Sequence, residues 1–575
     1  MELFISGTDE LRVLLLGARG AGKSSTGNTI LGCHTFNTDM QLSRVTQVCE
    51  RAFGIVHDWP VAIIDTPGLN RFGCTEREVT REILKSFSLY APGPHVFLMV
   101  MPIGNLTQDD HSMHKLVENM FGKSIWKYTV IVFTHGDRLG NKIPNDVIAC
   151  SDEGLREFIR KCSGGFVFFN NKDTDNYTYV SELLTKIDTL LAINGKGCYT
   201  TSFYPSAERK IRKKMERILE KRKQEIAKKE KDLGVLCKSE LELEREKQQM
   251  WRTEEEEARK RAEKSFKQRK TITKPHAFGR KTSTMWLLYL FQGDTEELCI
   301  LLLGARGSGK SSSGNTILRC NAFNTDMQLS RVTQICERAS GNINGRPVAI
   351  IDTPGLVKVN RMEKSVISEI LKSVSLYKPG PHVFLLVLPV GNLTNEDKNM
   401  HKLIENMFGR DVWKYTVILF THADRLEGKA PNDVIASSDK DLRDFIRKCS
   451  GGFVFFNNKD VEDSEQVSKL LEKIETLMAV NGRSCYTTSL FPASERKIRE
   501  KQKKILQQRE REIAQKEREL EENYEDEELE RMKRELWREE EENARKLAEN
   551  PQRRKSLSKN LTKTHLSIAK LQTIH

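Results

Sequence analysis

Short apolar runs alternate with amphipathic segments of helical length along two long stretches of this chain. In the first stretch the runs are rich in β-branched or aromatic residues, and segments such as 75–90 and 109–121 separate them. Near-continuous apolar strands between helices are typical of a parallel sheet that is covered on both faces. The pattern therefore predicts a three-layer α/β fold. The apolar runs of the first stretch are 11–16, 61–64, 96–100, 129–133 and 165–169.

The whole pattern occurs twice. Gly17 corresponds to Gly304, which lies 287 residues further along, and Asp65 corresponds to Asp352 at the same offset. The spacing between landmarks has therefore been kept throughout the unit. Solenoid repeats are only about 20–50 residues long. We therefore predict duplication of a complete domain.

Segments dominated by Glu, Lys and Arg follow each predicted domain. Apolar residues repeat in each segment at steps of seven or eight, which places them in one narrow stripe on a helix. The stripe can dock on its own domain, or it can form a coiled coil with another chain. Gly234 predicts a break between two helices in the first copy. The stripe residues are Ile211, Ile218, Ile226 and Leu233, and then Ile498, Ile505, Ile513 and Leu520.

These composition changes predict six regions. The first domain covers residues 8–203 and its charged helical extension covers 204–263, and a basic linker covers 264–294. The second domain covers 295–490, its extension covers 491–549, and a basic tail covers 550–575.

The net charge of +13 does not by itself indicate a nucleic-acid partner. Much of it lies in the linker and the tail, and nothing resembles a nucleic-acid-binding module. The tail also carries leucines, so it can lie on an anionic membrane or be disordered. The 12 cysteines include no C-x-x-C pair, and no apolar run reaches the ~20 residues of a membrane span. We expect a cytoplasmic protein, and peripheral contact with intracellular membranes stays an open alternative.

A glycine-rich loop follows the first strand of each copy. The run from Gly17 to Ser24 fits G-x-x-x-x-G-K-[ST] and lies between a strand and a helix, where backbone N–H groups can surround phosphate oxygens. Lys23 is predicted to reach the β- and γ-phosphates, and Ser24 to bind Mg²⁺. The predicted phosphate-binding residues are Gly17, Ala18, Arg19, Gly20, Ala21, Gly22, Lys23, Ser24 and Ser25, and then Gly304, Ala305, Arg306, Gly307, Ser308, Gly309, Lys310, Ser311 and Ser312.

A second motif, Asp-Thr-Pro-Gly, ends a later strand. The carboxylate of Asp65 is placed to hold Mg²⁺, and the N–H of Gly68 to contact the γ-phosphate. Thr46, between the two motifs, can complete the metal shell. Alternatively, Asp-Thr-Pro-Gly is an ordinary corner between a strand and a turn, and Thr46 is an ordinary hydroxyl residue of a loop. The corresponding metal ligands of the second copy are Ser311, Thr333 and Asp352, with Gly355 at the γ-phosphate.

Two further motifs are candidates for reading the base. In Thr134-His-Gly-Asp137, Asp137 can accept from guanine N1–H and from the exocyclic amine, two donors that adenine lacks on that edge. His135 is predicted to stack on the base, and Asn171 to contact its other edge. A histidine after a strand can also be an ordinary capping residue. The equivalents in the second copy are Thr421, His422, Asp424 and Asn458.

Between these motifs, the chain resembles the GIMAP (immunity-associated, AIG-type) GTPases. The resemblance rests on Gly93-Pro-His-Val96 with Gly104-Asn-Leu-Thr107, on their second copies at 380–383 and 391–394, and on the phrases around Thr46 and Asn170. The resemblance covers both domains, and the tandem arrangement is similar to that of the multi-domain members of the family. The resemblance implies septin-like G domains that bind GTP or GDP with Mg²⁺. It also implies homo- or hetero-oligomers through these domains, helices that fold back on the switch regions, and a role in immune cells.

Hydrolysis requires a group that orients the attacking water and positive charge that offsets the charge on the phosphoryl oxygens. Leu69 and Leu356 stand where Ras-like enzymes place a water-orienting Gln. Arg71 and Arg361 are alternative charge donors or ordinary surface residues. We expect slow intrinsic GTP hydrolysis, stimulated at best by dimerisation, and no catalytic residue is assigned. The alternative is a nucleotide-bound oligomeric scaffold on membranes without significant turnover.

Overall fold

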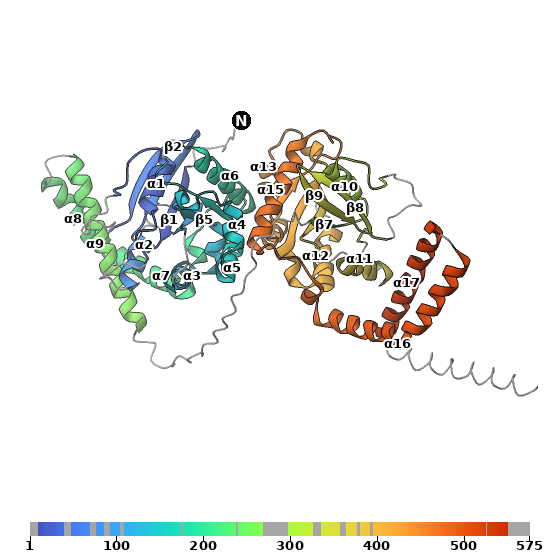
Figure 1. The fold of residues 1–575 in the computed structure, drawn as a ribbon. Helices are drawn as coiled ribbons and strands as arrows, with labels where there is room; N and C mark the ends of the chain where they lie inside the picture. Colours follow the sequence, from blue (N-terminus) through green and yellow to red (C-terminus); the bar gives the residue numbers. More distant parts are fainter. Residues whose placement is uncertain are drawn as a thin grey trace, which may run out of the picture. The chain divides into compact units, whose positions relative to one another are not determined.

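The structure is a computed structural model, and it divides the chain into two compact units. Met1–Pro144 and Asp152–Gly293 belong to the first unit, and Asp294–Val434 and Ser438–His575 to the second. Figure 1 shows one β-sheet with surrounding helices in each. The described residues are 10–38, 48–69, 76–85, 92–103, 108–173, 176–236, 240–267, 297–325, 335–356, 364–376, 380–391, 395–524 and 526–549.

The first sheet has six strands in the order β2-β3-β1-β4-β5-β6. All neighbours are parallel except β2 and β3, which form an antiparallel pair. The carboxyl ends of β1, β3 and β5 therefore lie at one edge, where the sequence motifs follow. The strands are β1 (Leu11–Gly17), β2 (Glu50–Val56), β3 (Trp59–Asp65), β4 (Val96–Pro102), β5 (Thr129–Thr134) and β6 (Phe166–Phe168).

Helices cover both faces of this sheet. On one face, Val13 and Leu98 belong to a buried cluster that includes Ile30 of α1 and Leu183 of α6. On the other face, the ring of Phe97 lies 5.3 Å from that of Phe121 at the end of α3. The predicted three-layer α/β fold is confirmed. The helices are α1 (Lys23–Leu31), α2 (Glu76–Lys85), α3 (Gln108–Phe121), α4 (Pro144–Ala149), α5 (Glu153–Lys161) and α6 (Thr178–Ile193).

The second unit repeats this topology, with the order β12-β11-β10-β7-β9-β8 and a single antiparallel pair, β8 with β9. Its strands are β7 (Leu298–Gly304), β8 (Glu337–Ile343), β9 (Arg346–Asp352), β10 (Val383–Pro389), β11 (Thr416–Thr421) and β12 (Phe453–Phe455). Its helices are α10 (Lys310–Leu318), α11 (Lys364–Leu376), α12 (Asn395–Phe408), α13 (Pro431–Ser437), α14 (Lys440–Lys448) and α15 (Ser464–Val480).

Each charged segment forms a helical hairpin beside its own sheet domain. In the first unit the hairpin consists of α7 (Ser206–Lys221), α8 (Lys223–Leu236) and α9 (Glu240–Lys267), and in the second of α16 (Ala493–Asn523) and α17 (Asp526–Glu549). Gly234 predicts a break between two helices in this segment. Helix α8 ends two residues after it, at Leu236, and α9 begins at Glu240, and a further break at Arg222 separates α7 from α8.

The apolar stripe packs within its own hairpin. Ile505 is buried in a small cluster with Ala544 and Ala548 of α17. Small alanines allow the two charged helices to approach each other closely, and Ala258 and Ala262 of α9 are buried at the equivalent places. Within the described part of the chain, no helix combines the length and the apolar character that crossing a bilayer requires. The basic linker and tail lie almost wholly outside the described residues.

Candidate functional site

The glycine-rich loop connects β1 to α1 in a conformation that requires glycine. A side chain at Gly17 would place its Cβ only 2.3 Å from the carbonyl oxygen of Val100 on β4. Gly22, immediately before α1, has a φ of 90°, a value that other residues rarely adopt. The helix therefore begins at Lys23 with its first N–H groups at the edge of the sheet, which is the arrangement that binds anions.

Lys23 is buried beneath this loop. Its Nζ donates to the carbonyl oxygens of Gly17 at 3.3 Å and Ala18 at 2.9 Å. Burial lowers the pKa of Lys23, and Asp65 opposes this effect only in part. Lys310 has the same bonds to Gly304 and Ala305, and burial lowers its pKa as well. In both copies a buried ammonium group therefore lacks full compensation from the described residues, and an anion at the loop would supply it.

The Asp-Thr-Pro-Gly motif contacts the second residue of the helix that follows the loop. The hydroxyl of Ser24 donates to Oδ2 of Asp65 at 2.5 Å, and that of Ser311 donates to Oδ2 of Asp352 at 2.6 Å. Burial raises the pKa of Asp352, and its Oδ1 is buried with no hydrogen-bond partner among the described residues. A hydroxyl beside a carboxylate with an oxygen to spare is a donor set that fits Mg²⁺, which prefers oxygen ligands.

The same motif closes against the glycine-rich loop. The N–H of Leu69 donates to the carbonyl of Gly17 at 3.1 Å, and a Cβ at Gly68 would lie 2.7 Å from the backbone of Arg19. Gly355 approaches Arg306 in the same way. Both predicted γ-phosphate glycines therefore lie against the loop. Thr46 and Thr333 lie outside the described residues, as do 104–107, 392–394, Arg71 and Arg361.

Thr134 joins the end of β5 to the glycine-rich loop. Its hydroxyl donates to the carbonyl of Ala21 at 2.8 Å and lies 3.1 Å from Nδ1 of His135. Thr421 makes the corresponding bond to Ser308 at 2.8 Å. These threonines thus position the loop. His135 and His422 have φ values of 63° and 62°, so the chain turns sharply at both.

Asp137 and Asp424, the predicted base-reading carboxylates, each pair with a lysine. Nζ of Lys172 lies 2.6 Å from Oδ2 of Asp137, and Nζ of Lys459 lies 2.7 Å from Oδ2 of Asp424. The hydrogen bond from the lysine holds the pKa of each carboxyl below its usual value. Both carboxylates are therefore ionised near neutral pH and able to accept hydrogen bonds.

The side chain of Asn171 is bonded to α1. Its Nδ2 donates to the Thr26 hydroxyl at 3.1 Å, and its Oδ1 accepts from the Thr29 hydroxyl at 3.0 Å. Asn458 is held in the same way by Ser313 and Thr316. This arrangement gives both asparagines a role in positioning the first helix. Their contact with a base stays a prediction.

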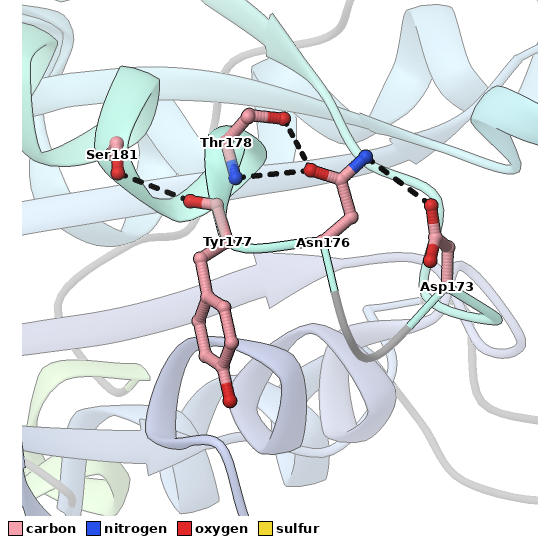
Figure 2. A pocket seen from close by; sticks show the side chains of 5 residues that line it. All are labelled: Asp173, Asn176, Tyr177, Thr178 and Ser181. Carbon is pink, nitrogen blue, oxygen red and sulfur yellow. Dashed lines mark hydrogen bonds between the residues drawn. The ribbon is translucent and has the colours of Figure 1, made fainter.

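A shallow pocket lies beside this region, at the start of α6. Figure 2 shows that its polar side chains bond to one another: Nδ2 of Asn176 donates to Asp173, and Oδ1 of Asn176 accepts from the backbone and the hydroxyl of Thr178. Tyr177 and Ser181 complete the lining. None of these residues belongs to the glycine-rich loop, so the pocket is separate from the predicted phosphate site.

The helical hairpins contact the helix that follows Asp-Thr-Pro-Gly in each copy. In the first, Arg81 of α2 forms an ion pair with Glu263 of α9 at 2.5 Å. In the second, Arg499 of α16 donates to the carbonyl of Leu371 on α11 at 2.6 Å, and Lys372 pairs with Glu541. Each hairpin therefore folds back on the helix after Asp-Thr-Pro-Gly, and the two copies achieve this with different residues. The implied fold-back on the switch regions stays a prediction, because residues 39–47 and 70–75 lie outside the described residues.

Several of these contacts had not been predicted from the sequence. Lys172 and Lys459 directly follow the F-N-N phrase in the two copies. The presence of the same residue at this position in both copies is the signal from which these lysines could have been found. The Arg81 contact had no such signal, because the second copy has Ser368 at that position.

Known proteins share this pattern. A model of the AIG1 family matches residues 11–218 and 298–508, more than half of the chain. Human GTPase IMAP family member 8 is 32% identical over 479 residues, which cover 82% of this chain and 63% of that protein. The rat protein of the same name is 30% identical, with 82% and 60% covered. This chain thus spans about three fifths of the length of these relatives.

More distant proteins match single domains. Immune-associated nucleotide-binding protein 9 of Arabidopsis thaliana is 30% identical over 214 residues, 36% of this chain and 63% of that protein. The crystal structure of Toc33 from Arabidopsis thaliana in complex with GDP and Mg²⁺ is 22% identical, covers 33% of this chain and 87% of that one, and has a TM-score of 0.27. From the match of the family model to both halves, we conclude that the chain belongs to the AIG1 family.

Proposed function

We propose that each domain binds one guanine nucleotide with Mg²⁺, and that the bound nucleotide controls self-association of the protein. The observation that carries this proposal is the buried, under-compensated Lys23 beneath a glycine-rich loop, repeated at Lys310. Retaining two such buried cations is costly unless a ligand supplies negative charge. The relatives named GTPase and nucleotide-binding protein support the same reading.

Each group in the site has a defined task in this proposal. The loop N–H groups and Lys23 bind the phosphates, and Ser24 and Asp65 hold the metal ion, directly or through water. Bound Mg²⁺ would supply positive charge that offsets the charge on the phosphate oxygens. Asp137 accepts from the two donors on the guanine edge, which selects guanine over adenine. The equivalent residues of the second domain perform the same tasks.

We propose that hydrolysis is slow. Leu69 and Leu356 are buried side chains that cannot orient a water molecule, and each holds its backbone N–H against the glycine-rich loop. Stimulation then requires a group from another domain or another chain. Oligomers through the G domains are part of this proposal. So are a cytoplasmic location with peripheral contact with intracellular membranes, and a role in immune defence, to which the relatives' names point.

The experiment measures assembly of the full chain by light scattering or ultracentrifugation with GDP and with a non-hydrolysable GTP analogue. Lys23→Ala and Lys310→Ala should each lose nucleotide at one site and shift the assembly response. Lys142→Ala and Lys429→Ala are matched controls, because these exposed lysines form no ion pair with any described residue. If assembly is the same with GDP and with the GTP analogue, the protein is a nucleotide-bound scaffold and the proposed control of self-association is wrong.

A further inference from the structure

The same lysine–aspartate pair is present at the base-reading position of both domains. Lys172 contacts Oδ2 of Asp137, and Lys459 contacts Oδ2 of Asp424, with distances that agree within 0.1 Å. The lysines are 76% exposed and the aspartates 28% and 25% exposed. The ammonium group therefore contacts one oxygen of an accessible carboxylate, and it approaches from the solvent side.

The loop after β6 is built to present this lysine. Oδ1 of Asn170 accepts from the N–H of Lys172 at 3.1 Å, and Asn457 does the same for Lys459. The next residue in the motif, Asn171, fixes the loop to α1. The N–H of Gly136 donates to the carbonyl of Phe169 at 2.8 Å, which joins this loop to the segment that carries Asp137. The pairing thus follows from two loops that are tied together.

Guanine and the lysine require the same acceptor. The guanine edge presents two donors, N1–H and the exocyclic amine, and a carboxylate accepts both by using both of its oxygens. In the structure, one of those oxygens already accepts from an ammonium group at 2.6–2.7 Å. Adenine presents no such pair of donors on that edge, so its binding would not require the carboxylate.

We propose that Lys172 and Lys459 compete with the guanine base for Asp137 and Asp424, so that guanine binding displaces the lysine. This inference rests on the proposed function and adds a regulatory element to the same site. The long, exposed lysine side chain can move into solvent without disturbing the loop. An exposed ion pair is weak and sensitive to salt, so the competition should reduce guanine affinity by a modest factor.

The test is calorimetric titration of the full chain with Mg²⁺-GDP and with Mg²⁺-ADP. The double variant Lys172→Ala/Lys459→Ala should bind GDP about two- to fivefold more tightly than the control Lys142→Ala/Lys429→Ala, and both should bind ADP equally. Lys172→Arg/Lys459→Arg, which retains the ion pair, should bind GDP like the wild type. Raising NaCl from about 0.1 M to about 1 M should reduce the difference, because screening weakens the pair.

Two results separate the possible failures. If the wild type prefers GDP over ADP and the double alanine variant binds GDP no more tightly than its control, the competition is refuted and the proposed function stands. If the wild type binds GDP no better than ADP, the proposed function fails, and the competition fails with it.

Discussion

A buried ion pair joins the two helices of the second hairpin at their ends. Two nitrogens of Arg545, near the end of α17, donate to the two carboxylate oxygens of Glu495 in the first turn of α16, each at 2.8 Å. Both side chains are only 9% exposed. We expect Arg545→Met, which keeps an unbranched apolar stem and removes the charge, to leave a buried carboxylate oxygen without this donor and to destabilise the hairpin.

The loss of hairpin stability in Arg545→Met depends on which hydrogen-bond donors still contact Glu495. Breaking a buried ion pair by removing one partner typically costs about 3–5 kcal/mol. Here Nε of Arg499 still donates to Oε1 of Glu495 at 3.2 Å, and this contact retains part of the compensation. We therefore expect a loss of about 2–3 kcal/mol, a factor of about 30–150 in the equilibrium between the closed and the open hairpin.

Hydrogen exchange of backbone amides measures this equilibrium directly, because α17 exchanges when the hairpin opens. In Arg545→Met, exchange in α17 should be faster by that factor. The double variant Glu495→Leu/Arg545→Met should recover part of the protection, since it removes both charges of the buried pair, while Arg499 loses its contact with Glu495 and retains its bond to the carbonyl of Leu371. Exchange within about threefold of the wild type, or a double variant as unprotected as the single one, would refute the reasoning.

Two further predictions concern single side chains. Asp137→Asn with Asp424→Asn should shift preference from GDP to xanthosine diphosphate, because the amide nitrogen can donate to the C2 carbonyl that xanthine has in place of the guanine amine; competition binding tests this, and an unchanged preference for GDP would contradict it. Ser308→Ala should stabilise the second domain by about 1 kcal/mol, because the Ser308 hydroxyl is buried with no hydrogen-bond partner among the described residues and the first copy has Ala21 there. Thermal unfolding checks this, with Ala21→Ser as the reciprocal variant, and a lower Tm for Ser308→Ala would count against it.

The sheet and the glycine-rich loop could be predicted because each rests on a local rule. Apolar runs between helices indicate parallel strands, and the carboxyl ends of such strands meet at one edge. Gly17 and Gly22 are required by a close approach and by a positive φ, both of which belong to this motif wherever it occurs. The loop could therefore be placed before any tertiary contact was known.

The partners of particular side chains could not be predicted in this way. The F-N-N phrase is the same whether the amide of Asn171 faces a base or, as in the structure, bonds to Thr26 and Thr29. The stripe at Ile505 has the same period whether it packs on another chain or on α17. Gly234 lowers helix propensity, and α8 ends two residues after it, whereas no glycine or proline marks the break at Arg222.

The central claim is that each of the two domains holds one guanine nucleotide. Its most direct test is the stoichiometry of GDP binding to the full chain in the presence of Mg²⁺, by calorimetry, with Lys23→Ala and Lys310→Ala measured in parallel. The account predicts two sites per chain in the wild type, one in each single variant and none in the double variant. A wild type that binds no GDP, or single variants that retain both sites, would contradict it.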